Sequence, residues 1–128
     1  MDDDAAIRNL FARYCHLIDD ARFAEWASLF TVDGTFRTPL GDATGHEALE
    51  SFITDMLPPE RRGRHLCANT MIDVEGDRAS AVTDYVFMAP VDGGFAVRGT
   101  SRYYDVLVRV EDSWRFAERT IVPFAQPG

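Results

Sequence analysis

The sequence is poor in the residues that several kinds of site require. It has two cysteines and three histidines in 128 residues, and none falls in a CxxC motif or in Cys/His metal-ligand spacing. Two cysteines are too few for a disulfide framework, so reduced thiols and a cytoplasmic location are expected. The sequence also lacks a glycine-rich phosphate loop and a GxSxG nucleophile motif. These absences argue against metal, cofactor and covalent chemistry.

Positive charge and long apolar runs are scarce as well. The chain has 13 Lys and Arg against 21 Asp and Glu, a formal net charge of −8. Nucleic acids and anionic membranes attract basic faces, so neither is expected as a partner. No apolar run approaches the roughly 20 residues that span a bilayer, and the acidic start MDDDAAIRNL is unlike a targeting peptide. The length suits one domain, residues 1–128.

Helical periodicity dominates the first half of the chain. Apolar residues recur every three or four positions over 7–18, which predicts an amphipathic helix with one apolar stripe. A shorter helix is expected over 23–30 and a third over 44–57, where two prolines end it. Between them, residues 34–40 predict a short strand.

Strand patterns dominate the second half. Three turn signals separate four β-rich runs, which are Arg64–Val74, Arg78–Pro90, Phe95–Val110 and Trp114–Phe124. Helices followed by an antiparallel meander predict an α+β domain with the helices on one face of the sheet.

The turn at Gly76-Asp77 predicts the register of the first two long strands. A two-residue turn places Glu75 opposite Arg78, and counting back places Asn69 opposite Asp84. The residues that would share one face are His65, Cys67, Asn69 and Asp84, and those of the other face are Leu66, Ala68, Tyr85 and Phe87. A slip of one residue would separate His65 from Asp84.

Three strand residues are candidates for a site. Imidazole is the side chain best suited to proton transfer near neutral pH, although His65 could instead only hydrogen-bond a backbone carbonyl. Asp84 alternates with apolar residues, and a buried acid must be paired, hydrogen-bonded or neutralised. Its expected partner is Arg119. The two residues either line the site together or form a purely structural ion pair.

Two further candidates lie at the end of the first helix. Tyr14 belongs to the apolar stripe but carries a hydroxyl that needs a polar partner when buried. Asp19 stands at a helix–helix corner, where it either caps the second helix or serves a site. The two residues point roughly 140° apart on an ideal helix. They address one cavity only if the helix end unwinds or the cavity wraps around it.

Several segments resemble the SnoaL-like family of the NTF2-like superfamily. They are Tyr14-x4-Asp19, FAEWASLFTVDGTF, GHEAL, RHLCANTMIDVEGDRA and RYYDVLVRVEDSWRFAERTIV, and they cover nearly the whole chain. The resemblance implies a cone, in which a curved antiparallel sheet wraps around three N-terminal helices and an internal pocket. It also implies a homo-oligomer, dimer or trimer, that packs through the outer face of the sheet, with Leu66, Tyr85 and Phe87 as candidate surface.

Two dehydratases of this superfamily resemble the candidate residues best. Asp19 and His65 match the helix-end Asp and the strand His of scytalone dehydratase, but its second pocket His has no counterpart here. By similar spacing, the residues Tyr14, Asp19, His65, Asp84 and Arg119 match the Tyr, Asp, His, second Asp and C-terminal Arg of bile-acid dehydratase. The match of Asp84 crosses a region of different length.

The resemblance therefore implies a cofactor-independent acid–base enzyme of dehydratase, isomerase or cyclase type. Its substrate would be a hydrophobic oxygenated small molecule, such as a polyketide, steroid or aromatic metabolite. His65 would transfer the proton, Asp19 would set its tautomer, and Tyr14 would donate to a developing oxyanion. Asp84 and Arg119 would complete the polar wall. The alternative is a non-catalytic module of the same fold that binds a ligand or a partner subunit.

Overall fold

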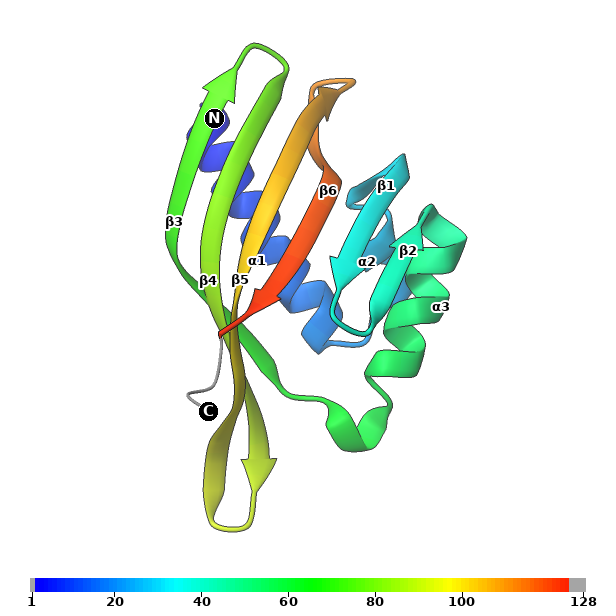
Figure 1. Ribbon diagram of the computed structural model, residues 1–128, viewed down its shortest axis with the longest axis vertical. Coiled ribbons are helices and arrows are strands. Elements are labelled where there is room, and N and C mark those ends of the chain that lie inside the picture. Colours follow the sequence, from blue (N-terminus) through cyan, green and yellow to red (C-terminus); the bar gives the residue numbers. More distant parts are fainter. Residues whose placement is uncertain (1, 125–128) are drawn as a thin grey trace.

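The computed structural model describes residues 2–124 (Figure 1). The elements in chain order are α1 (Asp3–Asp19), α2 (Phe23–Ala27), β1 (Phe30–Thr38), β2 (Gly41–Thr44), α3 (His46–Met56), the 3₁₀ helix η1 (Pro59–Arg61), β3 (Arg64–Glu75), β4 (Arg78–Val91), β5 (Gly94–Val110) and β6 (Ser113–Pro123). The three helices, the four long strands and the α+β class are confirmed. The expected strand at 34–40 corresponds to β1, which begins earlier, ends at Thr38 and forms a hairpin with β2.

The strands form one sheet in the order β2-β1-β6-β5-β4-β3. Every neighbouring pair is antiparallel except β1 and β6, which run parallel. The sheet is therefore mixed, whereas the resemblance implied an antiparallel one. No hairpin joins β1 to β6, so the chain does not force these two strands into opposite directions.

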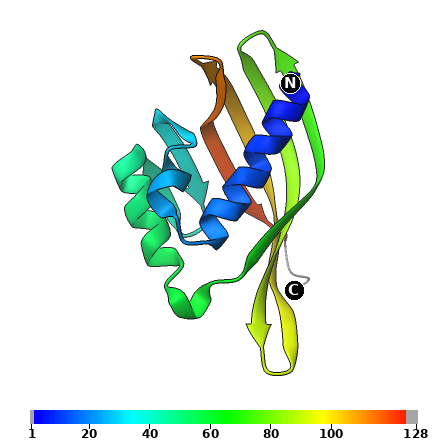
Figure 2. The same ribbon diagram turned by 180° about the vertical axis from the view of Figure 1, so that it is seen from behind.

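The helices cover one face of the sheet. Figure 2 shows α1 lying diagonally across the long strands, with α2 and α3 beside β1 and β2. The apolar stripe of α1 is buried against this face, and the largest buried aromatic side chains there are Tyr14, Trp26, Phe30, Phe36, Tyr103 and Phe116. Burial of each such side chain contributes on the order of 1.5–3 kcal/mol. Within residues 2–124, no helix is long and apolar enough to cross a membrane.

Local signals set both ends of α1. The Asp2 carboxylate accepts a hydrogen bond from the Ala5 amide at 2.7 Å and caps the first turn. The helix ends at Asp19, and Ala21 then takes a left-handed conformation with φ of 58°. The last residue of α1, Asp19, faces the beginning of β3, where its carboxylate accepts a hydrogen bond from the His65 amide.

A β-bulge in β3 changes the predicted register. Glu75 lies opposite Arg78 as predicted, but the pairing shifts between Ala68 and Met71, where two residues of β3 oppose one of β4. Asn69 in this bulge has φ of 57°. Beyond it, Ala68 rather than Asn69 pairs with Asp84. The bulge produces the one-residue slip that exchanges the faces of a strand.

The predicted set of residues on one face is consequently wrong for half of its members. His65 now pairs with Phe87, and Cys67 with Tyr85. The residues that face the helices are therefore His65, Cys67, Tyr85 and Phe87, whereas Leu66, Ala68, Asp84 and Val86 lie on the outer face. Tyr85 and Phe87 pack against the core, so they are unavailable as an outer surface for a second subunit.

Candidate active site

The centre of the candidate site is a hydrogen-bonded pair from two elements. The ring Nδ1 of His65 on β3 lies 2.7 Å from the Asp19 carboxylate at the end of α1. The same carboxylate accepts the backbone amide of His65 at 3.1 Å from each oxygen. The side chains are only 10% and 5% exposed, respectively. Asp19 does not cap α2, which has no side-chain cap.

This geometry assigns the protons of the neutral His65 ring. An ionised carboxylate only accepts hydrogen bonds, so Nδ1 carries the proton and donates a hydrogen bond to Asp19. Nε2 then has a free lone pair, and among residues 2–124 no hydrogen bond to it is formed. A positioned imidazole with one nitrogen held by a carboxylate and the other free is suited to general acid–base chemistry.

The pair lines an opening between helix and sheet, which we call the α1–β3 hollow. Its volume is about 460 Å³, and its walls include Phe11, Cys15, Asp19, Arg64, His65 and Cys67. The His65 ring also packs on Phe87, with centroids 4.7 Å apart. The hollow thus joins apolar surface to polar side chains, among them the imidazoles of His65 and His16, which is the usual composition of a small-molecule site.

Arg119 forms an ion pair in the core. Its Nε and Nη2 donate to the two oxygens of Asp105 at 2.7 and 2.8 Å, and both side chains are completely buried. Burial would lower the pKa of this guanidinium, but the Asp105 carboxylate raises it above the ordinary value. The Arg119 cation also lies 3.7 Å from the centre of the Tyr103 ring.

Tyr14 lies beside Arg119 and away from the hollow. The Arg119 cation is 4.4 Å from the centre of its ring. Tyr14 is fully buried, and its hydroxyl has no hydrogen-bond partner among residues 2–124. Burial raises the pKa of this phenol above its usual value, so it stays protonated and able to donate.

Two stacked tyrosines connect the His65–Asp19 pair to the Arg119–Asp105 ion pair. Tyr103, which packs on Arg119, stacks on Tyr85 with centroids 4.3 Å apart. Tyr85 in turn lies beside the His65 ring at 5.9 Å. Four of the predicted site residues therefore belong to one continuous cluster, as two close pairs: His65 with Asp19, and Arg119 with Tyr14.

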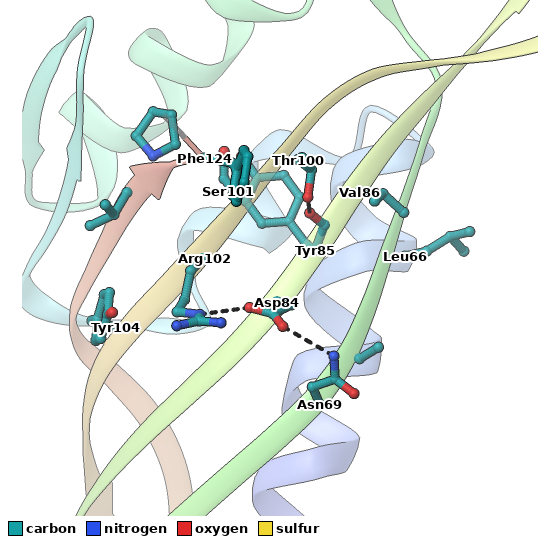
Figure 3. Close-up of a pocket in the computed structure, with 13 residues that line it drawn as sticks. Leu66, Asn69, Asp84, Tyr85, Val86, Thr100, Ser101, Arg102, Tyr104 and Phe124 are labelled. Carbon is teal, nitrogen blue, oxygen red and sulfur yellow. Dashed lines mark hydrogen bonds and ion pairs between the residues drawn. The ribbon is translucent and has the colours of Figure 1, made fainter. Parts of the chain in front are cut away.

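Asp84 does not belong to this cluster, and its predicted pairing with Arg119 is wrong. Figure 3 shows the Asp84 carboxylate between Arg102 and Asn69, which donate to it at 2.6 and 3.0 Å. These two hydrogen bonds hold the pKa of Asp84 below its ordinary value. Asp84 alternates on β4 with Thr83 and Tyr85, which face the helices, so it lines a groove of about 580 Å³ on the outer face of the sheet. The bulge in β3 places His65 on the opposite face from Asp84.

Asp105, the true partner of Arg119, was missed by the sequence analysis. The signal that pointed to Asp84 applies equally to Asp105, which alternates on β5 with the buried residues Tyr103 and Leu107. Asp105 and Arg119 are directly opposite each other on β5 and β6. The pattern therefore offered two candidates for a buried acid, and the strand pairing buries only Asp105 of the two.

Comparison with known proteins identifies the family. A profile of the SnoaL-like domain matches residues 1–120. A variant of Rv3472 from Mycobacterium tuberculosis, a protein of unknown function, is 30% identical with a TM-score of 0.91 over 97% of this chain and 73% of that one. An NTF2-like protein with a cystatin-like fold from Novosphingobium aromaticivorans is 26% identical, with a TM-score of 0.87 over 95% and 82% of the two chains.

Other matches are more distant. A second protein from Novosphingobium aromaticivorans, whose name suggests a scytalone dehydratase, is 22% identical, with a TM-score of 0.83 over 96% of this chain and 85% of that one. At this identity the likeness shows the fold alone. None of the curated proteins matches the sequence. The profile match over nearly the whole chain nevertheless decides the matter, and the protein belongs to the SnoaL-like family of the NTF2-like superfamily.

Proposed function

We propose that this protein is a cofactor-independent acid–base enzyme, a lyase of dehydratase type or an isomerase. The observation that carries this proposal is the 2.7 Å hydrogen bond between His65 Nδ1 and Asp19 at the wall of the α1–β3 hollow. It leaves His65 Nε2 as a base that can take a proton from a bound substrate. The family supports the reaction class, since a protein of similar fold carries a dehydratase name.

The reaction would begin with removal of a proton beside a substrate carbonyl by His65 Nε2. The resulting imidazolium would then give this proton to a departing hydroxyl, or return it to another carbon in an isomerisation. Asp19 would hold the ring in one tautomer and stabilise its positive charge. Because the pair is almost fully buried, water would compete weakly for these hydrogen bonds.

The walls of the hollow support a hydrophobic substrate that carries oxygen atoms. Phe11 and Ala12 supply apolar surface, and Arg8 and Arg64 supply cationic donors for oxygen. A polyketide, steroid or aromatic metabolite fits this description. Tyr14 does not line the hollow and lies beside Arg119, so it takes no part in this step.

A panel of hydroxy-ketones, enones and epoxides, followed by mass spectrometry, tests the proposal. The wild-type protein should convert at least one compound, and His65→Ala should lose about 10²–10⁴-fold in kcat/KM. Asp84→Asn is the matched control, because this acid lies on the opposite face of the sheet. An active His65→Ala variant with wild-type rates would refute the mechanism.

The outer-face groove favours a second candidate, a non-catalytic module that binds a ligand or a partner subunit. Its apolar lining includes Leu66, Val86 and Val122. This candidate predicts no turnover across the panel. It also predicts that the affinity of any bound ligand is unchanged in His65→Ala.

A further inference from the structure

Cys15 and Cys67 are two thiols that the proposed acid–base reaction does not use. Their sulfur atoms lie 3.4 Å apart although 52 positions separate the residues in sequence. Both are free cysteines and the chain has no others. Sulfur atoms in a disulfide are about 2.0 Å apart, so a movement on the order of 1 Å would bring this pair to bonding distance.

The two thiols lie on the same two elements as Asp19 and His65, next to that pair. Cys15 lies one helical turn before Asp19 on α1, and Cys67 is the next residue after His65 on the same face of β3. A bond between the sulfur atoms would therefore join α1 to β3 directly beside the proton-transfer pair. The positions are compatible because hydrogen bonds already hold the two elements together there.

The α1–β3 hollow gives a small oxidant access to both sulfur atoms. Cys15 and Cys67 line this hollow, and Cys67 is the more exposed of the two. The hydrogen bond shared with Cys15, in which either sulfur can donate, and the positive charge of Arg119 lower the pKa of the Cys67 thiol. The same hydrogen bond and burial raise the pKa of Cys15. Cys67 is therefore the thiol that attacks first, and Cys15 follows.

We propose that Cys15 and Cys67 are a redox-modification site that hydrogen peroxide converts into an intramolecular disulfide. The Cys67 thiolate attacks one peroxide oxygen, the O–O bond breaks, and the other oxygen leaves as water, so that a sulfenic acid forms. The Cys15 sulfur then attacks the Cys67 sulfur, the S–O bond breaks, and the hydroxyl leaves as water with the Cys15 proton. In total, two thiols lose two electrons and two protons, and one peroxide becomes two waters.

The disulfide would change the hollow in which it forms. It would tie α1 to β3 and draw together the two walls between which a substrate must enter. We therefore expect oxidation to weaken ligand binding or turnover at His65, and reduction to restore it. This consequence rests on the proposed function, whereas formation of the disulfide does not.

Oxidation of the reduced full-length protein with hydrogen peroxide tests the modification. Intact mass should fall by two hydrogens, both free thiols should disappear, and a non-reducing peptide map should link Cys15 to Cys67. Dithiothreitol should reverse all three changes. The thermal midpoint of the oxidised protein should exceed that of the reduced protein, because the bond restricts the unfolded chain.

Two single variants separate the roles of the thiols. Cys15→Ser should stop at a sulfenic acid on Cys67, which dimedone traps, and Cys67→Ser should remain reduced at the same peroxide dose. Thiols that stay reduced in the wild type, oxidation to sulfinic acid without a cross-link, or disulfide-linked dimers would each overturn the proposal. If the cross-link forms but the panel shows no turnover, the proposed function fails and the redox site stands.

Discussion

The Asp19 carboxylate accepts hydrogen bonds from both the backbone amide and the ring nitrogen of His65. It thereby fixes the position and the tautomer of the imidazole together. One carboxylate at the end of α1 accepts from Nδ1 at 2.7 Å and from the amide at 3.1 Å. The first residues of β3 and the last of α1 are thus joined at the point where proton transfer is proposed.

Asp19→Asn should reduce kcat/KM by about 10²–10⁴-fold once a substrate is known, because the amide carries no charge to stabilise the imidazolium. Nitrogen-15 NMR of the His65 ring offers a readout that needs no substrate. In the wild type the neutral ring should carry its proton on Nδ1, and in the variant this preference should weaken. Asp84→Asn, the matched control, should leave both quantities unchanged.

Asp105→Asn should destabilise the fold by about 3–5 kcal/mol, because it leaves the buried Arg119 cation without its charged partner. Chemical denaturation with two spectroscopic probes measures this difference. Asp84→Asn again serves as control, since its ion pair with Arg102 is exposed and should matter much less. A double variant, Asp105→Leu with Arg119→Met, should recover most of the stability. Failure of Asp105→Asn to destabilise would show that the cation finds another partner.

Alkaline pH should destabilise the protein through its buried tyrosines. Burial raises the pKa of Tyr14 and Tyr103 above the ordinary value of about 10, so the unfolded state loses these protons first. The contribution is fully present below about pH 10 and is lost as pH rises toward the folded-state pKa. Thermal melts between pH 8 and 11 should show a steep fall that Tyr14→Phe makes shallower.

Tyr104→Phe is the control for this experiment, because Tyr104 lies half-exposed on the outer face. It should leave the alkaline slope unchanged. Equal slopes for wild type and Tyr14→Phe would contradict the assignment of the effect to Tyr14.

A homo-oligomer through the outer face of the sheet remains a proposal. Leu66, Val122 and Phe124 are 51%, 46% and 67% exposed there, which is a large apolar area for a free surface. Light scattering after size exclusion should give a mass of two or three chains, and Leu66→Asp should shift it toward one. Arg78→Asp, an exposed substitution at the far end of β4, should not. A monomeric wild type would end the proposal.

Much of the fold was predictable because local patterns encode it. The apolar stripe of α1 and the Gly76-Asp77 turn determine an amphipathic helix and a hairpin. Both patterns depend on residues close in sequence, so no long-range information is needed. The parallel pairing of β1 with β6 was not predictable in this way. The two strands are far apart in sequence, and no turn joins them to indicate their relative direction or register.

The same distinction between local and long-range information applies to the candidate site. The sequence by itself determined that His65 and Asp19 are chemically suited to one site and that Arg119 needs an acidic partner. Only the tertiary structure decided that Asp105 is this partner and that Asp84 lies outside. The reason is long-range strand pairing, which sets Asp105 directly opposite Arg119 on β5 and β6. The bulge at Asn69, a single extra residue in β3, leaves the turn unchanged but places His65 on the helix face, away from Asp84.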